Sequence, residues 1–93
     1  MGAQIGPQSR PRLPRGVKLR HDEVRGAWTL LAPERVFQID ETAAAVLKLC
    51  DGERDFAAIV AELASRYKAD PGVIARDVGA MLGDLADKRV LES

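Results

Sequence analysis

Apolar side chains alternate with polar ones in three short segments of the first half of the chain, a spacing typical of strands with one buried face. The segments are residues 17–22, 27–32 and 35–39. A turn ending at Gly26 joins the first two, and Pro33-Glu34 turns the chain into the third. Connections this short favour an antiparallel meander. Its last strand, Arg35–Ile39, can present a backbone edge that has no partner.

The apolar spacing changes to three and four residues after Asp40, which predicts helices. Asp40, Asp55 and Asp70 are candidate N-caps, and Pro71 suits a first helical position. The apolar stripes are Ala43, Val46, Leu47 and Cys50; Phe56, Ile59, Val60, Leu63 and Tyr67; and Ile74, Val78, Met81, Leu82 and Leu85. We expect Trp28, Phe37, Phe56 and Tyr67 to lie in the core. Three strands followed by three helices predict an α+β, winged helix-turn-helix-like domain over residues 17–93.

Residues 1–16 differ from the rest in composition. They contain three Pro and three Gly, with Arg10, Arg12 and Arg15 among them, and few apolar side chains. This composition predicts a flexible Pro/Arg-rich tail or linker.

The third helix carries small residues beside its apolar stripe, namely Gly72, Ala75, Gly79, Gly83 and Ala86. A Gly inside a helix costs about 1 kcal/mol relative to Ala, so its presence needs a reason. Two explanations fit: tight packing against the Ala-rich first helix, or a shallow groove wall for a foreign peptide.

The composition argues against several classes of function, among them nucleic-acid binding, zinc binding and membrane insertion. Lys+Arg and Asp+Glu number 14 each, which argues against a duplex-binding protein. One Cys and one His cannot assemble a zinc site. No cofactor-binding or catalytic motif stands out, so we expect a non-catalytic binding module without cofactors. No apolar run is long enough to span a bilayer, and the first 15 residues lack the apolar core of a signal peptide, so a cytoplasmic protein without membrane contact is expected.

The order of elements and motifs from about Leu13 to Leu91 resembles the pyrroloquinoline quinone (PQQ) biosynthesis protein D family. The motifs that carry the resemblance are Pro-Arg-Gly-Val-Lys-Leu-Arg at 14–20, Leu-Leu-Ala-Pro-Glu-Arg-Val at 30–36, the Thr42-Ala43 helix start, Leu-Cys-Asp-Gly at 49–52, Tyr67, and the segment Val78–Leu91.

The resemblance implies a module that binds the ribosomally made precursor peptide of PQQ. It further implies presentation of that peptide to a radical S-adenosylmethionine (SAM) enzyme, which cross-links a Glu and a Tyr, and fusion behind another pathway protein in some organisms. The peptide would add a strand to the third strand beside the third helix. The expected peptide-binding residues are Arg35, Val36, Phe37, Gln38, Ile39, Ala75, Asp77, Val78, Gly79, Met81, Leu82, Asp84 and Leu85.

Two other functions stay open at this point. A winged-helix domain can bind DNA, although the third helix balances Arg76, Lys88 and Arg89 against Asp77, Asp84 and Asp87. A structural dimerisation domain is the other alternative. Within the peptide-binding hypothesis, Phe37 and Ile39 should face inward, and Val36 and Gln38 should be more exposed.

Overall fold

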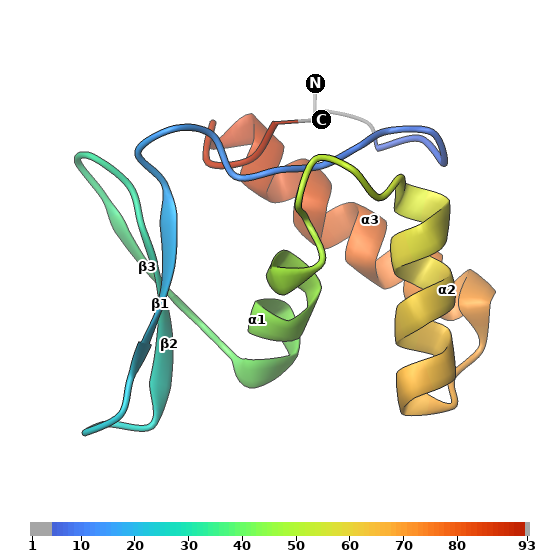
Figure 1. The fold of residues 1–93 in the computed structure, drawn as a ribbon, viewed down its shortest axis with the longest axis horizontal. Helices are drawn as coiled ribbons and strands as arrows, with labels where there is room; N and C mark the ends of the chain where they lie inside the picture. The colour runs from blue at the N-terminus through green and yellow to red at the C-terminus, as the bar shows by residue number, and fades with distance from the viewer. Residues whose placement is uncertain (1–4, 93) are drawn as a thin grey trace.

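The computed structural model describes residues 5–92. Three strands come first, β1 (Lys18–Asp22), β2 (Ala27–Leu31) and β3 (Val36–Ile39). Three helices follow, α1 (Glu41–Lys48), α2 (Phe56–Tyr67) and α3 (Pro71–Asp87). The sheet stands on one side of the molecule, α1 lies beside it, and α2 and α3 form the other side (Figure 1). The predicted fold class is confirmed.

The sheet is an antiparallel meander in the order β1-β2-β3. Lys18 pairs with Leu31 across the first two strands, and Leu31 pairs with Val36 across the second two. Gly26 takes a φ of +63° in the hairpin, a conformation that glycine adopts without steric cost. Because β2 is central, β1 and β3 are both edge strands.

Each helix begins at the aspartate that the sequence predicts as its cap. Asp40 Oδ1 accepts a hydrogen bond from the Ala43 N–H at 2.7 Å, and Asp55 and Asp70 do the same in α2 and α3. These carboxylates bind N–H groups in the first turn that have no intrahelical partner.

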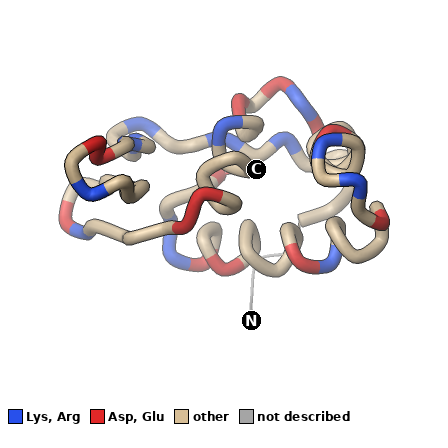
Figure 2. Tube along the Cα trace, turned by 90° about the horizontal axis from the view of Figure 1, so that it is seen from below, with Lys and Arg blue, Asp and Glu red and all other residues tan. Residues whose placement is uncertain are grey.

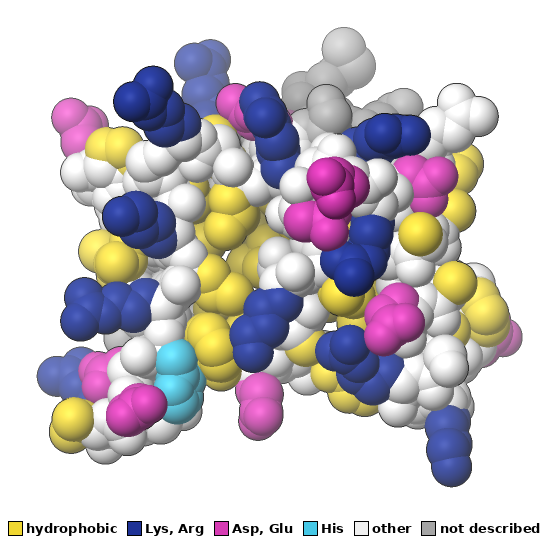
Figure 3. Space-filling view, viewed as in Figure 1, with side chains coloured by type: hydrophobic (Ala, Val, Ile, Leu, Met, Phe, Trp, Pro, Cys, Tyr) yellow, Lys and Arg dark blue, Asp and Glu magenta, His cyan; other side chains and the backbone are white. Residues whose placement is uncertain are grey.

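The core lies between the sheet and the helices. Leu30 of β2, Ile59 and Leu63 of α2, and Leu82 of α3 are each at most 1% exposed. Hydrophobic side chains are visible in the seam between the sheet and the helices, and Lys and Arg side chains stand out along the sheet's border (Figure 3). Tyr67 is a correction to the predicted core, because this last residue of α2 is 48% exposed. The α2 stripe therefore ends one turn earlier.

The chain before β1 differs from the expected flexible tail. Residues 7–13, which we call the strap, run over the top of the molecule from α2 to the sheet (Figure 1). Arg12 exchanges two backbone hydrogen bonds with Glu92, and Pro11 is fully buried. Residues 1–4 of the predicted tail lie outside the described residues.

The strap also completes the start of α2. The Phe56 N–H donates to the Ser9 carbonyl at 2.7 Å, and the Ala57 N–H donates to the Pro7 carbonyl at 3.0 Å. These donors are among those that a helix N-terminus leaves unsatisfied. A Pro-rich composition predicts a tail because Pro has no N–H to donate within a helix or sheet. The Pro carbonyl still accepts hydrogen bonds, however, and here it binds the start of α2.

Candidate peptide-binding cleft

The outer edge of β3 has two residues whose main-chain groups face away from the sheet. Ala32 and Arg35 exchange both backbone hydrogen bonds, at 2.9 and 3.4 Å, and so form a hydrogen-bonded pair. Such pairs alternate along an antiparallel ladder, and with the observed register the next ones join Phe37 and Ile39 to β2. The N–H and C=O groups of Val36 and Gln38 therefore point to the open edge.

Side chains alternate along β3 in the same way. Phe37 and Ile39 are half-buried and pack against the core cluster, whereas Val36 is 64% exposed and Gln38 is exposed. The expected inward and outward sets are confirmed. A strand added at this edge would meet main-chain groups of the exposed pair and lie next to two apolar side chains.

The C-terminal part of α3 lies beside the start of β3. The Arg35 guanidinium donates a hydrogen bond to the Lys88 carbonyl, just past the end of α3. Lys88 Nζ is 6.0 Å from the centre of the Phe37 ring, and the Arg35 guanidinium is 5.3 Å from it. These contacts place the end of α3 next to the start of β3, and we call the surface between them the candidate cleft.

The residues of α3 on the same side as Lys88 follow from their spacing. Lys88 lies four, seven and eleven residues after Asp84, Met81 and Asp77, a spacing that places all four on the same side of a helix. Lys88 Nζ pairs with Asp84 Oδ2 at 2.7 Å, and Met81 is half-buried. We call Asp77, Met81, Asp84 and Lys88 the cleft flank. Asp77, Met81 and Asp84 are among the expected peptide-binding residues, and Lys88 is not, although its spacing from Met81 and Asp84 could have indicated it.

The other predicted residues of α3 lie elsewhere. Val78, Leu82 and Leu85 are buried in the core at 8%, 0% and 8% exposure. A Cβ built on Gly79 would lie 3.5 Å from Phe56 Cζ, so Gly79 faces α2. Ala75 lines an apolar hollow of about 430 Å³ together with Pro7, Phe56 and Val60. The small-residue strip thus packs on the α2 side, and neither the groove wall beside β3 nor the first helix is its partner at Gly79.

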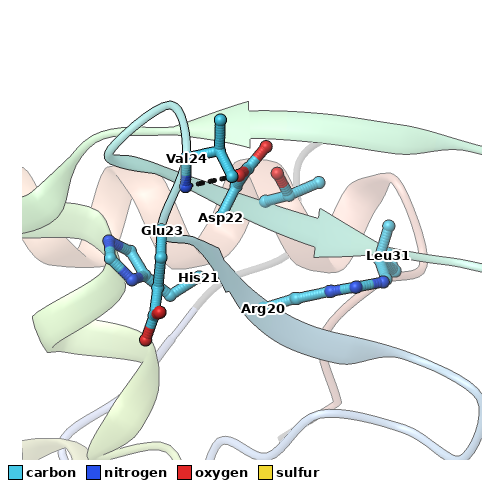
Figure 4. Close-up of a pocket in the computed structure, with 7 residues that line it drawn as sticks. Arg20, His21, Asp22, Glu23, Val24 and Leu31 are labelled. Atoms are coloured by element: carbon cyan, nitrogen blue, oxygen red, sulfur yellow. Dashed lines mark hydrogen bonds between the residues drawn. The ribbon is translucent and has the colours of Figure 1, made fainter.

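Two further hollows lie near the β1–β2 hairpin. The larger one, about 560 Å³, is lined by Arg20, Asp22, Thr29 and Leu31 on the outer face of the sheet and by the hairpin itself. Figure 4 shows Arg20 extended toward Leu31, and the Val24 N–H bound to the Asp22 carboxylate at 3.0 Å. This polar, shallow surface lies away from the cleft.

The smaller hollow lies at the end of β3. It measures about 310 Å³, and Trp28, Ile39, Asp40 and Glu41 are among its lining residues. Trp28 is half-buried, with His21 at 4.6 Å between ring centroids and Lys48 Nζ 4.3 Å from its ring. Because a cation already lies against this indole, the ring acts as a packing surface between strand and helix.

Cys50 and Asp51 have perturbed acidities. Burial, followed by the charge of Asp51, raises the pKa of the Cys50 thiol to about 12. Backbone N–H groups of Arg54 and Glu53 donate to the Asp51 carboxylate and lower its pKa. The thiol also donates to the Val46 carbonyl at 3.4 Å, so Cys50 packs in the core as expected and is not poised as a nucleophile.

Charge and metal-binding groups add no second site. Residues 10–20 carry five Lys and Arg side chains and no Asp or Glu, whereas from Asp22 onward the two signs are mixed along the chain (Figure 2). Within residues 5–92, no group of His, Cys, Asp or Glu side chains could hold a metal ion. Over the same residues, no helix is long and apolar enough to cross a membrane.

The fold is a small winged-helix-like domain, and the outer edge of β3 has no partner strand among the described residues. The family model for coenzyme PQQ synthesis protein D (PqqD) matches residues 27–91. The chain belongs to the PqqD family.

Relatives and solved structures agree with this assignment. The chain is 56% identical to the PqqA binding protein of Rhodopseudomonas palustris strain TIE-1 over 87 residues, which are 94% of this chain and 85% of that protein. It is also 56% identical to a bifunctional coenzyme PQQ synthesis protein C/D of Methylorubrum extorquens, covering 88% of this chain and 22% of that one. A solution NMR structure of the PqqD truncation of Methylobacterium extorquens PqqCD matches with a TM-score of 0.84 and 52% identity, covering 96% of this chain and 95% of that one. That protein is described as a functional, stand-alone recognition element for ribosomally synthesized and post-translationally modified peptides.

Proposed function

We propose that this chain binds the precursor peptide PqqA as an added strand on β3, in the cleft beside α3. The observation that carries the proposal is the orientation of the Val36 and Gln38 main-chain groups toward an edge that has no partner strand among the described residues. Strand addition takes its affinity from such groups and its selectivity from adjacent side chains. Family membership and the PqqA-binding name of a relative support the identity of the guest.

The cleft has the parts that this mode of binding needs. Val36 and Gln38 supply two N–H donors and two C=O acceptors. Phe37 and Ile39 supply an apolar floor that is half-buried without a guest. The cleft flank of α3 supplies a wall with carboxylates at Asp77 and Asp84, both exposed and able to contribute selectivity at the rim. Ala75, Val78, Gly79, Leu82 and Leu85 act behind this wall, by holding α3 in place.

We further propose that the bound peptide is presented to the radical SAM enzyme of the pathway for its Glu–Tyr cross-link, in the cytoplasm and without catalysis by this chain. The family resemblance implies that partner. The existence of a protein C/D relative supports fusion to, or association with, another pathway protein. The strap binds the start of α2 and the C-terminal segment. It therefore leaves the main-chain groups of Val36 and Gln38 open.

The Val36→Pro substitution tests strand addition. It removes an N–H that makes no bond to β2, so the sheet should still form while a guest strand loses one main-chain hydrogen bond. A net hydrogen bond is worth about 0.5–1.5 kcal/mol, which corresponds to a loss of PqqA affinity of roughly two- to tenfold in isothermal titration. Circular dichroism and thermal unfolding check that the variant is folded.

Two control variants separate the edge from other causes. Val36→Ala keeps the N–H and should bind PqqA more tightly than Val36→Pro does. His21→Pro removes the corresponding outward N–H from β1, the other edge strand, and should leave PqqA affinity unchanged. Unchanged affinity in a folded Val36→Pro protein would reject strand addition at β3. So would amide shifts of the parent protein that avoid residues 35–39 and the cleft flank.

A further inference from the structure

We propose that the β3 edge selects a guest segment by the order of its charges, with a basic residue toward its N-terminal end and an acidic residue about five positions later. This inference rests on the strand addition proposed above and adds the kind of segment that the site accepts. It is carried by charged side chains of opposite sign at the two ends of β3.

The start of β3 carries positive charge. Arg35 and Arg89 line one hollow of about 230 Å³ at this end, and both side chains are exposed. Arg35 is held by the Lys88 carbonyl, and Arg89 makes no ion pair or side-chain hydrogen bond within residues 5–92. Glu34 lies in the same hollow and offsets one charge, while Lys88 is already paired with Asp84. Among the charged residues that line this hollow, Arg35 and Arg89 outnumber Glu34, so its lining carries a net positive charge.

The far end of β3 carries negative charge. Asp40 follows the strand directly and keeps its carboxylate on the first turn of α1. Glu41 comes next, is exposed, and makes no ion pair or side-chain hydrogen bond with another described residue. Lys48 lies over Trp28 in this neighbourhood and offsets one of the two charges. A net negative charge is left here.

The separation of the two ends makes them independent. A strand rises about 3.3 Å per residue, so the five steps from Arg35 to Asp40 span about 17 Å. The Debye length at physiological ionic strength is about 8 Å. Each end therefore acts on the part of the guest nearest to it, and a pair of guest charges must be about five residues apart to meet both ends.

The order of those charges follows from strand direction. Antiparallel pairing is slightly more stable per residue than parallel pairing and continues the meander of this sheet. An antiparallel guest places its N-terminal part beside Asp40 and Glu41 and its C-terminal part beside Arg35 and Arg89. A basic residue first and an acidic residue later therefore meet opposite charges, and the reverse order meets like charges at both ends.

Two synthetic peptides test this order. Both have capped termini and the same composition, with Val and Thr alternating at the centre. One carries Lys near its N-terminus and Glu five residues later, and the other has these two residues exchanged. One exposed ion pair changes an equilibrium by up to about fivefold, and the first peptide can form one pair at each end of β3. It should therefore bind about tenfold more tightly than the second peptide in an NMR titration that follows the Val36 and Gln38 amides.

A charge-reversed protein provides the second arm. The double variant Arg89→Glu/Glu41→Lys should reverse the preference, because neither side chain is bonded within the described fold. If this variant does not fold, the parent protein at about 1 M salt replaces it, since a Debye length of about 3 Å should abolish the preference. Equal affinities, a preference that survives both treatments, or no amide shifts with either peptide at millimolar concentration would overturn the inference.

The outcome is distinguishable from failure of the proposed function. If Val36→Pro weakens PqqA binding but the two peptides bind equally, strand addition stands and only the charge order is rejected. If Val36→Pro leaves PqqA binding unchanged, the proposed site itself is rejected, whatever the peptides do.

Discussion

Replacing Gly79 by Ala tests whether this face of α3 packs against α2 or contacts the bound peptide. Gly79 lies in the middle of this helix, where Gly costs about 1 kcal/mol relative to Ala. The new Cβ would lie 3.5 Å from Phe56 Cζ, an ordinary van der Waals contact that requires no movement. The substitution should therefore stabilise the fold by roughly 0.5–1 kcal/mol.

Thermal and urea unfolding measure this change. For a domain of 60–100 residues, 1 kcal/mol moves the midpoint by about 4–8 °C, so the Gly79→Ala variant should melt about 2–8 °C higher. Ala80→Gly is the matched control, because Ala80 is its exposed neighbour in the same helix. That change should lower the stability by about 1 kcal/mol, the intrinsic helix cost without a tertiary contact.

The same variant also reports on the cleft. Because Gly79 faces α2, its replacement by Ala should leave PqqA affinity unchanged. Destabilisation by more than about 0.5 kcal/mol would refute the reasoning, since the added methyl group would then have no room. If the Gly79→Ala variant is folded but binds PqqA with altered affinity, Gly79 contributes to the peptide-binding surface after all.

Two further predictions follow from the perturbed acidities. Cys50 should resist modification by a thiol reagent at pH 8 in the folded protein and react at an ordinary rate in denaturant, because burial keeps it protonated; rapid labelling of the native state would contradict this. The lowered pKa of Asp51 means that its carboxylate contributes stability above its ordinary pKa near 3.8, and that this contribution is lost as the pH falls through the lower folded value. Asp51→Asn should therefore flatten the fall in stability below about pH 4, and an unchanged acid profile would contradict that role.

Local signals made much of this fold predictable. Alternation over 35–39 identified β3 and the two sets of side chains on it, because strand side chains have a strict period of two. Asp40, Asp55 and Asp70 identified the helix starts, because a cap acts on N–H groups only two or three residues away. Val90 and Leu91, at 1% and 3% exposure, fold back onto the core as their apolar character indicates.

Other features depend on contacts between segments that are distant in the sequence. The strap resembles a tail in sequence because Pro, Arg and polar residues dominate it and no apolar periodicity marks it. Its order comes from hydrogen bonds to Gly52, Phe56 and Ala57 in the α2 region and to Glu92 near the chain's end. No local pattern encodes the position of those partners, so composition alone gave the opposite expectation.

The candidate site divides in the same way. The sequence by itself determined that β3 is an edge strand candidate and that α3 carries both apolar and small residues, since these follow from periodicity. Only the tertiary structure decided how α3 is rotated, which places Gly79 against Phe56 and brings Lys88 Nζ to 6.0 Å from the centre of the Phe37 ring. Helical periodicity defines which residues share a face, but packing against the rest of the chain decides what each face meets.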